Sequence, residues 1–164
     1  MIRPLDPGAD QDAVLDLYAR AADYLDLESG RTPEPGLAQE FFSDAPPGGD
    51  PSTSLGLFGD GRLLGLADLA FGYPKPTDAY LGLMILAAEA RGRGLGRAFL
   101  RHVEAAAQER GAVRLLLAVL EANPRGRAFW EGQGFRKPKV FPATRIGART
   151  HVRIRLEKPL GSGS

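Results

Sequence analysis

The sequence predicts a mixed α/β domain whose sheet begins antiparallel and contains a parallel crossover in its second half. Strand-like and helix-like segments alternate along the chain, and Gly59-Asp60-Gly61 is a hairpin turn signal between two early strands. Two uniformly apolar segments, residues 80–86 and 115–120, flank a helical segment, which is typical of buried parallel strands. With 164 residues, 43% of them hydrophobic, we expect one domain over 1–160 and a flexible tail at 161–164.

The first elements follow from local signals. Residues 2–5 are expected to form an edge strand, because Pro4 has no amide to give to a central ladder. Behind a cap at Asp10, apolar residues spaced by three and four predict one amphipathic helix to about Leu27. A shorter helix over 35–42 should end at the loop 44–51, which is rich in turn-forming residues.

The later elements show clearer periodicity. The helix at 94–110 places Leu95, Phe99, His102, Val103 and Ala106 on one side. The last segment alternates Val152, Ile154 and Leu156 with polar residues such as His151, which predicts a strand with one face in water. The expected elements from the hairpin onward are strands at 54–58, 62–71 and 80–86, the helix, a strand at 115–120, a short helix from the cap Asn123 to about Gln133, and strands at 135–140 and 150–157.

Composition excludes several classes of site. The chain has no cysteine, so disulfides, thiolate nucleophiles and cysteine-bound metals are ruled out. Two histidines, His102 and His151, are too few for an ordinary zinc site, so no metal is expected. No apolar run approaches the roughly 20 residues of a membrane helix, and the N-terminus lacks a long apolar segment. We therefore expect a cytoplasmic protein with no membrane partner.

Charge is divided unevenly between the two halves of the chain. Residues 1–90 contain 15 acids and 5 bases, a net charge of −10, whereas residues 91–164 contain 5 acids and 16 bases, a net charge of +11. One reading is that the halves neutralise each other in the fold. The other is that the basic half holds a polyanion and the acidic half faces a cation.

The strongest chemical signal is the segment Arg91-Gly92-Arg93-Gly94-Leu95-Gly96-Arg97, which joins a buried strand to a helix. Glycines let a ligand approach main-chain amides, and the helix directs free N–H groups and its positive dipole end at the loop. Together with the arginines, these groups predict a phosphate or diphosphate cradle. A glycine-rich turn whose arginines merely face solvent is the alternative. The segment matches neither a Walker loop nor a Rossmann fingerprint, because it lacks Gly-Lys-Ser/Thr and has Arg97 where a third glycine belongs.

With these residues in view, the chain resembles the GNAT superfamily of acetyl-CoA-dependent N-acetyltransferases. The loop from Arg91 to Gly96 matches the family pattern Gln/Arg-x-x-Gly-x-Gly/Ala, and residues 123–135 (NPRGRAFWEGQGF) resemble its second signature. The resemblance covers roughly residues 80–140. It implies a mostly antiparallel sheet of about seven strands with helices on both faces, in which the fourth and fifth strands are parallel and splayed.

The resemblance also implies roles at matching positions. Residues 91–97 would hold the diphosphate of coenzyme A (CoA), and the main chain of Met84, Ile85 and Leu86 would pair with the pantetheine arm, with one amide polarising the thioester carbonyl. Asn123 would contact the same arm, or act only as a helix cap. Trp130 occupies the position where many members have a tyrosine that protonates the thiolate. An indole cannot supply that proton, so Trp130 would only line the cofactor wall, and either a water or Tyr80 would protonate the sulfur.

Acetyl transfer needs a group that takes a proton from the amine, whose ordinary pKa is near about 10.4. The candidate bases are Asp68, Asp78 and Glu121; His151 is a weaker one, better read as a polar residue on an edge strand. Tyr24, Asp26 and Glu28 form an acidic, aromatic group at the end of the first helix that suits a cationic amine, or simply a solvated helix end.

Three functions compete. The first is an acetyltransferase that moves an acetyl group from acetyl-CoA to a primary amine of a small molecule or peptide, by direct attack in a ternary complex. The second is an acyl-CoA-binding sensor without turnover, which the missing tyrosine favours. Nucleic-acid binding by the basic half is the third, and no recognition motif supports it. Association into a homodimer is possible through residues 149–157.

Overall fold

The computed structural model describes residues 1–43 and 53–161. The loop predicted at 44–51 and the last three residues of the predicted tail lie outside this part. In chain order the elements are β1 (Ile2–Pro4), α1 (Gln11–Arg20), α2 (Ala22–Ser29), α3 (Gly36–Ser43), β2 (Thr53–Gly59), β3 (Arg62–Phe71), β4 (Asp78–Leu86), η1 (Ala88–Ala90), α4 (Leu95–Glu109), β5 (Arg114–Leu120), α5 (Pro124–Gly132), β6 (Arg136–Val140), β7 (Thr144–Ile146), β8 (Arg149–His151) and β9 (Arg153–Pro159).

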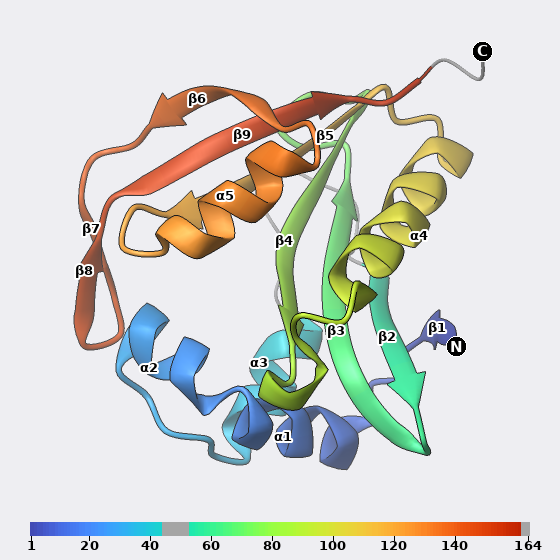
Figure 1. Ribbon diagram of the computed structural model, residues 1–164, viewed down its shortest axis with the longest axis vertical. Coiled ribbons are helices and arrows are strands. Elements are labelled where there is room, and N and C mark those ends of the chain that lie inside the picture. The colour runs from blue at the N-terminus through green and yellow to red at the C-terminus, as the bar shows by residue number, and fades with distance from the viewer. Residues whose placement is uncertain (44–52, 162–164) are drawn as a thin grey trace.

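The centre of the molecule is a seven-stranded sheet in the order β1-β2-β3-β4-β5-β9-β6. Every neighbouring pair is antiparallel except β4 and β5, which are parallel and joined through α4. Figure 1 shows α4 and α5 on one face of this sheet, with α1, α2 and α3 gathered at one end. The predicted mixed α/β class and the parallel pair in the second half are confirmed.

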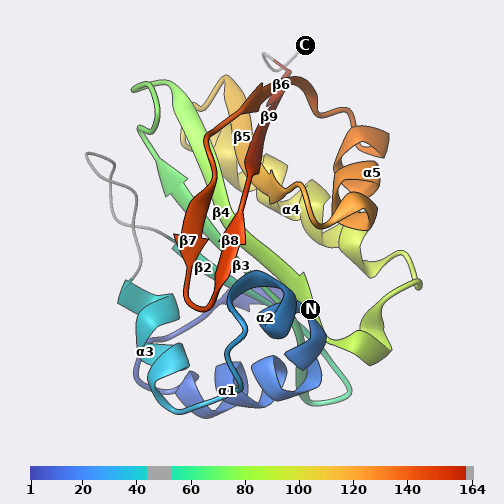
Figure 2. The same ribbon diagram turned by 90° about the vertical axis from the view of Figure 1, so that its left-hand side faces the viewer.

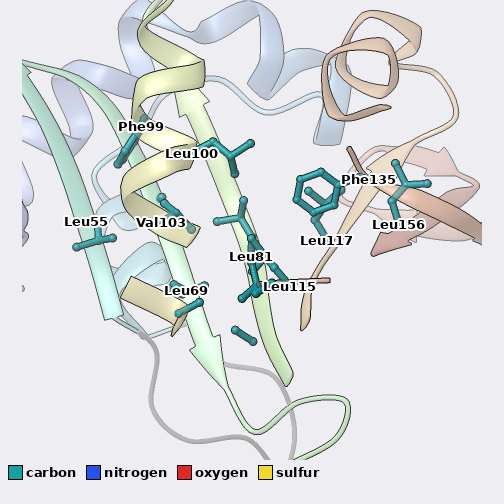
Figure 3. Close-up of a cluster of buried hydrophobic side chains, with 14 of the residues drawn as sticks. Leu55, Leu69, Leu81, Phe99, Leu100, Val103, Leu115, Leu117, Phe135 and Leu156 are labelled. Carbon is teal, nitrogen blue, oxygen red and sulfur yellow. The ribbon is translucent and has the colours of Figure 1, made fainter. Parts of the chain in front are cut away.

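Two apolar clusters bind the helices to the sheet. The larger one joins α4 to residues of β2, β3, β4, β5 and β9 and includes Phe99, Leu117 and Phe135 (Figure 3). The smaller one joins α1, α2 and α3 to the other face, through residues such as Leu66 and Ile85. Helices therefore cover both faces, and the sheet is buried between two layers over its central part.

A bulge at Gly82 changes which face of the sheet the residues of β4 point to. Asp68 pairs with Leu83 and Leu69 pairs with Leu81, so Gly82 is an extra residue on β4. Before the bulge, Leu81 packs in the larger cluster; after it, Leu83 packs against the smaller one. Residues 80–86 are apolar at both parities because both faces of β4 are covered, and the bulge moves the odd-numbered residues from the larger cluster to the smaller one.

The predicted helix from Asp10 to about Leu27 is two helices. Ala21 has φ −125° and ψ 30°, outside the helical region, and it separates α1 from α2. The apolar periodicity continues through Ala21, which is fully buried, so the sequence pattern did not reveal the break. The change of direction lets α1 pack on β3 while α2 reaches the hairpin of β7 and β8 (Figure 2).

The predicted strand at 150–157 is also divided. β8 ends at His151 and β9 begins at Arg153, and β7 and β8 form a separate two-stranded hairpin that the sequence did not predict. His151 is buried rather than solvated, because its Nε2 lies 2.9 Å from both Leu27 O and Glu28 O at the end of α2. His102 was predicted to lie with the apolar residues on one side of the helix at 94–110. This prediction is wrong, because His102 is exposed on α4.

The first turn of the chain is closed by a charged pair with a testable pH dependence. Asp10 accepts hydrogen bonds from both terminal nitrogens of Arg3 and from the Asp6 amide. The hydrogen bonds from Arg3, above all, hold the pKa of Asp10 below its ordinary value. This contribution to stability is therefore present above the ordinary carboxyl pKa and is lost as the pH falls through the lowered one.

We expect Asp10→Asn to reduce the free energy of unfolding by about 1.5 to 3 kcal/mol at neutral pH, because hydrogen bonds to a charged group are lost. The deficit should shrink as the pH falls below about 4, because the unfolded chain then takes up a proton at Asp10, and it should vanish once the pH has passed the lowered pKa of the folded state. Urea denaturation between pH 2.5 and 7 measures this. Asp12→Asn, an exposed change on α1, is the control, and a deficit independent of pH would contradict the interpretation.

Candidate active site

The strands β4 and β5 separate in the middle of the sheet. Their register runs from Asp78 opposite Arg114 to Leu81 opposite Leu117 and stops there. Beyond this point a cavity of about 770 Å³, here called the splay cavity, lies between Gly82–Leu86 on one side and Ala118–Leu120 on the other. Main-chain groups of both strands face it without pairing to each other, so an extended ligand can add to the ladder there.

The glycine-rich loop forms one end of the splay cavity. Gly92 and Gly94 have φ of 74° and 77°, and a Cβ built on either one would meet nothing within 4 Å. α4 begins directly after Gly94, and no side chain caps its free amides. Open space above the loop, free helix amides and the nearby guanidinium of Arg97 fit an anionic group such as a diphosphate.

The loop arginines lie in different surroundings. Arg91 lines the splay cavity, but its guanidinium is held by Asp23 of α2 at 2.6 and 3.0 Å, and its Nε donates to Leu86 O. This pairing keeps the pKa of the Asp23 carboxyl below its usual range. Arg93 and Leu95 do not line the cavity: Arg93 is exposed, and Leu95 packs against both apolar clusters.

The opposite wall comes from α5. Asn123 caps this helix by accepting a hydrogen bond of 3.0 Å from the Gly126 amide, and the same residue lines the splay cavity. Trp130 also lines it, held edge-to-face between Phe129 and Phe135 at ring distances of 4.9 and 5.5 Å. Asn123 therefore caps the helix and lines the cavity at the same time, and Trp130 forms part of the cavity wall.

A second cavity of about 470 Å³ shares lining residues with the first at the bulge. This helix-side cavity lies between the helices α1, α2 and α3, the β7–β8 hairpin and β4, and it shares Gly82 and Leu83 with the splay cavity. Asp68 lines it and is buried, with its Oδ2 placed 3.4 Å from where a Gly82 Cβ would stand. A carboxylate is thus set beside the junction of the two cavities.

The other candidate bases and the candidate acid lie elsewhere. Asp78 is at the closed end of β4, where Arg114 binds it at 2.6 and 2.9 Å, and it lines neither cavity. Glu121 is exposed in the turn after β5. Tyr80 packs edge-to-face with Tyr73, and burial raises its pKa. The geometry therefore leaves Asp68 as the one member of this set that lines either cavity.

The predicted acidic group on α2 is split among three surroundings. Asp26 faces outward and pairs with Arg149 at 3.1 Å. Glu28 lines the helix-side cavity, whereas Tyr24 lines the splay cavity, and the Tyr24 hydroxyl donates to Glu28 Oε2 over 3.3 Å. Burial, with a smaller effect from Glu28, raises the pKa of Tyr24 well above its ordinary value.

Sequence reasoning missed several lining residues. Arg125, Phe129 and Gln133 complete the α5 side of the splay cavity, and Tyr18 and Phe41 give the helix-side cavity aromatic walls. Arg125, Phe129 and Gln133 are spaced four residues apart and so share one side of the helical segment, which could have identified them. Nothing local marks Tyr18 or Phe41, because each reads as part of an ordinary apolar helix face.

A comparison of the sequence with known families now decides the classification: the profile of the "Acetyltransferase (GNAT) family" matches residues 13–135. The chain belongs to the GNAT acetyltransferase family. An acetyltransferase from Thermus thermophilus is 27% identical, with a TM-score of 0.75 over 98% of this chain and 96% of that one. A GCN5-related N-acetyltransferase from Kribbella flavida is 25% identical, with a TM-score of 0.71 over 98% and 97% of the two chains.

Other similarities are more distant. The ribosomal-protein-S18-alanine N-acetyltransferase of Escherichia coli, 20% identical with a TM-score of 0.70 over all of this chain and 96% of that one, shares the fold. No protein of curated function matches the chain. Acetyl transfer is the general chemistry of this GNAT chain. In the described ranges, no helix is long and apolar enough to cross a membrane, and no group of three potential ligands is placed to hold a metal ion.

Proposed function

We propose that the protein transfers an acetyl group from acetyl-CoA to a primary amine, with both substrates bound at once. The observation that carries this proposal is that Gly82 and Leu83 lie in the walls of both cavities, with the Asp68 carboxylate beside Gly82. An acyl donor in one cavity and an amine in the other would have their reacting atoms side by side. Such placement of two reactants is a large part of the catalytic advantage in group transfer.

On the donor side, acetyl-CoA supplies an activated acetyl group. The amides at the start of α4, together with Arg97, are suited to its diphosphate. The unpaired main chain of Met84–Leu86 is suited to its amide-bearing arm, as an added strand would be. A main-chain N–H at the bulge would stabilise negative charge on the carbonyl oxygen, where one donor contributes on the order of 2.7–4 kcal/mol.

On the acceptor side, the carboxylates of Asp68 and Glu28 favour a cationic amine over an anionic one. We assign Asp68 as the base that takes the first proton from the ammonium group, since it is buried beside the bulge. The neutral amine then attacks the carbonyl carbon. Tyr18, Phe41 and Leu83 give this cavity an apolar wall, which suits an acceptor whose amine is attached to an apolar arm.

The donor assignment is tested by reversing one charge. Arg97→Glu should weaken CoA binding by about 10- to 100-fold in isothermal titration, because a charged hydrogen bond to phosphate is replaced by repulsion. Arg101→Glu is the matched control, one helical turn further along α4, exposed and outside both cavities. Equal affinity in wild type and Arg97→Glu would remove the cradle assignment.

The second candidate function is an acyl-CoA sensor without turnover, and the tryptophan at position 130 is the feature that favours it. A turnover assay separates the sensor from an enzyme. Release of thiol from acetyl-CoA is measured with a panel of polyamines, aminoglycosides, amino acids and peptides, and the products are weighed by mass spectrometry. Acetylated amine supports the enzyme. Binding of CoA with no product across the panel favours the sensor.

A further inference from the structure

One residue that lines the splay cavity carries a hydroxyl group that could act as an acid, and it belongs to α2 rather than to α5. With tryptophan at position 130, the aromatic that faces this cavity from α5 cannot act as an acid. Among the described residues that line the cavity, Tyr24 of α2 is the only one with a hydroxyl group. Tyr24 thus brings the one hydroxyl-bearing side chain among these lining residues from α2, and α5 contributes other residues to the same cavity.

Tyr24 is also connected to the acceptor side. Its hydroxyl donates to Glu28 Oε2 over 3.3 Å, and Glu28 lines the helix-side cavity. The two residues are one helical turn apart on α2, so the backbone of that helix fixes their spacing. This pair forms a hydrogen-bonded connection between the two cavities that does not pass through the strands.

We propose that Glu28 and Tyr24 carry a proton from the attacking amine to the departing sulfur, with Tyr24 as the catalytic acid. The inference rests on the proposed acetyl transfer. Two protons leave an ammonium acceptor: Asp68 takes the first and passes it to solvent, which frees the amine to attack. As the N–C bond forms and the C–S bond breaks, the second proton goes from nitrogen to Glu28, from Glu28 to the phenol oxygen, and the phenol proton goes to sulfur.

The direction of this relay follows from ordinary acidities. A carboxylic acid has a pKa near about 4.3 and a thiol near about 8.5, so transfer from protonated Glu28 to the thiolate is downhill. A free phenol would be a poor acid for a thiolate, and burial beside Glu28 makes it poorer still by raising the phenol pKa. Tyr24 therefore acts only when Glu28 has received the amine's proton, which links departure of sulfur to attack by nitrogen.

The first test asks whether the phenol reaches the sulfur, and it requires no turnover. Isothermal titration compares CoA with desulfo-CoA, which lacks the sulfur. Wild type should prefer CoA by about 2- to 5-fold, the contribution of one weak hydrogen bond from the thiol to the phenol oxygen while the phenol proton stays directed at Glu28, and Tyr24→Phe should lose that preference. Tyr73→Phe is the matched control, because Tyr73 packs on Tyr80 and lines neither cavity.

The second test measures the relay in turnover. Tyr24→Phe should lower kcat by about 100-fold, the lower end for lost general acid catalysis, with little change in KM for acetyl-CoA. Glu28→Gln should lower kcat as well, and adding Tyr24→Phe to it should cost little more, because either change breaks the same relay. Wild type should show a solvent deuterium isotope effect on kcat that Tyr24→Phe reduces.

The outcomes separate the two proposals. Wild type that binds CoA but acetylates no amine overturns the proposed function, and the relay with it. Wild type that acetylates an amine, with Tyr24→Phe unchanged in kcat or still preferring CoA over desulfo-CoA, overturns the relay alone. Independent, multiplying losses in the double variant also contradict it, because a shared pathway cannot be broken twice.

Discussion

Asp68→Asn is expected to lower kcat by about 100- to 1,000-fold at pH 7, while CoA affinity stays within about twofold of wild type. The amine arrives charged, and without the carboxylate only the small neutral fraction can attack. Activity of the variant should therefore rise about tenfold per pH unit until the pKa of the amine, near about 10.4 for an alkyl amine. Thiol release measured from pH 6 to 10.5 gives both the loss and the slope.

Two comparisons make this result specific to Asp68. Glu121→Gln, exposed and outside both cavities, should keep wild-type kcat at every pH. Asparagine has nearly the same shape as aspartate, so titration with CoA will show whether the fold and the splay cavity are retained. A variant that keeps the wild-type rate at pH 7 would place the base elsewhere.

Arg114→Met is expected to reduce the free energy of unfolding by about 3–5 kcal/mol. Asp78 is almost fully buried, with 2% of its side chain exposed, and Arg114 binds both of its carboxylate oxygens. Removing the guanidinium leaves a carboxylate in the sheet interior with only the Lys75 amide close to it among the described partners. Urea denaturation at pH 7 measures the loss.

The double variant Asp78→Leu with Arg114→Met serves as the control. It should be markedly more stable than Arg114→Met alone, because an apolar pair leaves no buried charge. Glu157 then keeps partial access to solvent, with 20% of its side chain exposed. Equal instability of the two variants would show that the packing of the Arg114 side chain, and not its charge, matters at this end of β4.

The elements around the splay cavity could be predicted because their signals are local. The loop 91–97, the cap at Asn123 and the two flanking strands are each encoded in a short stretch of sequence, and their conformations follow from glycine, helix-cap and strand chemistry. The charge asymmetry corresponds in part to ion pairs between the two halves of the chain. Asp23–Arg91, Asp26–Arg149 and Asp78–Arg114 pair the acidic half with the basic half, while Arg97 and Arg125 line one cavity and Asp68 and Glu28 line the other.

The features that sequence reasoning missed depend on contacts between distant segments. His151 and Arg149 of β8 hold the β7–β8 hairpin against α2 by hydrogen bonds to Leu27 and Asp26, which lie more than 120 positions earlier in the chain. Asp78 and Asp68 look alike as acids near strands, and only the opposing Arg114 or the Gly82 bulge distinguishes a structural charge from one beside a cavity. Ala21 breaks a helix whose periodicity continues unchanged.

The separation of β4 from β5 after Leu81 and Leu117 places two strand edges in the interior of the sheet. Outer edges are protected from pairing between molecules by proline and lysine, as Pro4 does on β1 and Pro138 and Lys139 do on β6. The same protection at the inner edges would also block the strand-like ligand proposed above, which would use these amides and carbonyls. The empty chain would therefore leave these edges open to pairing with another chain, and the bound ligand would close them.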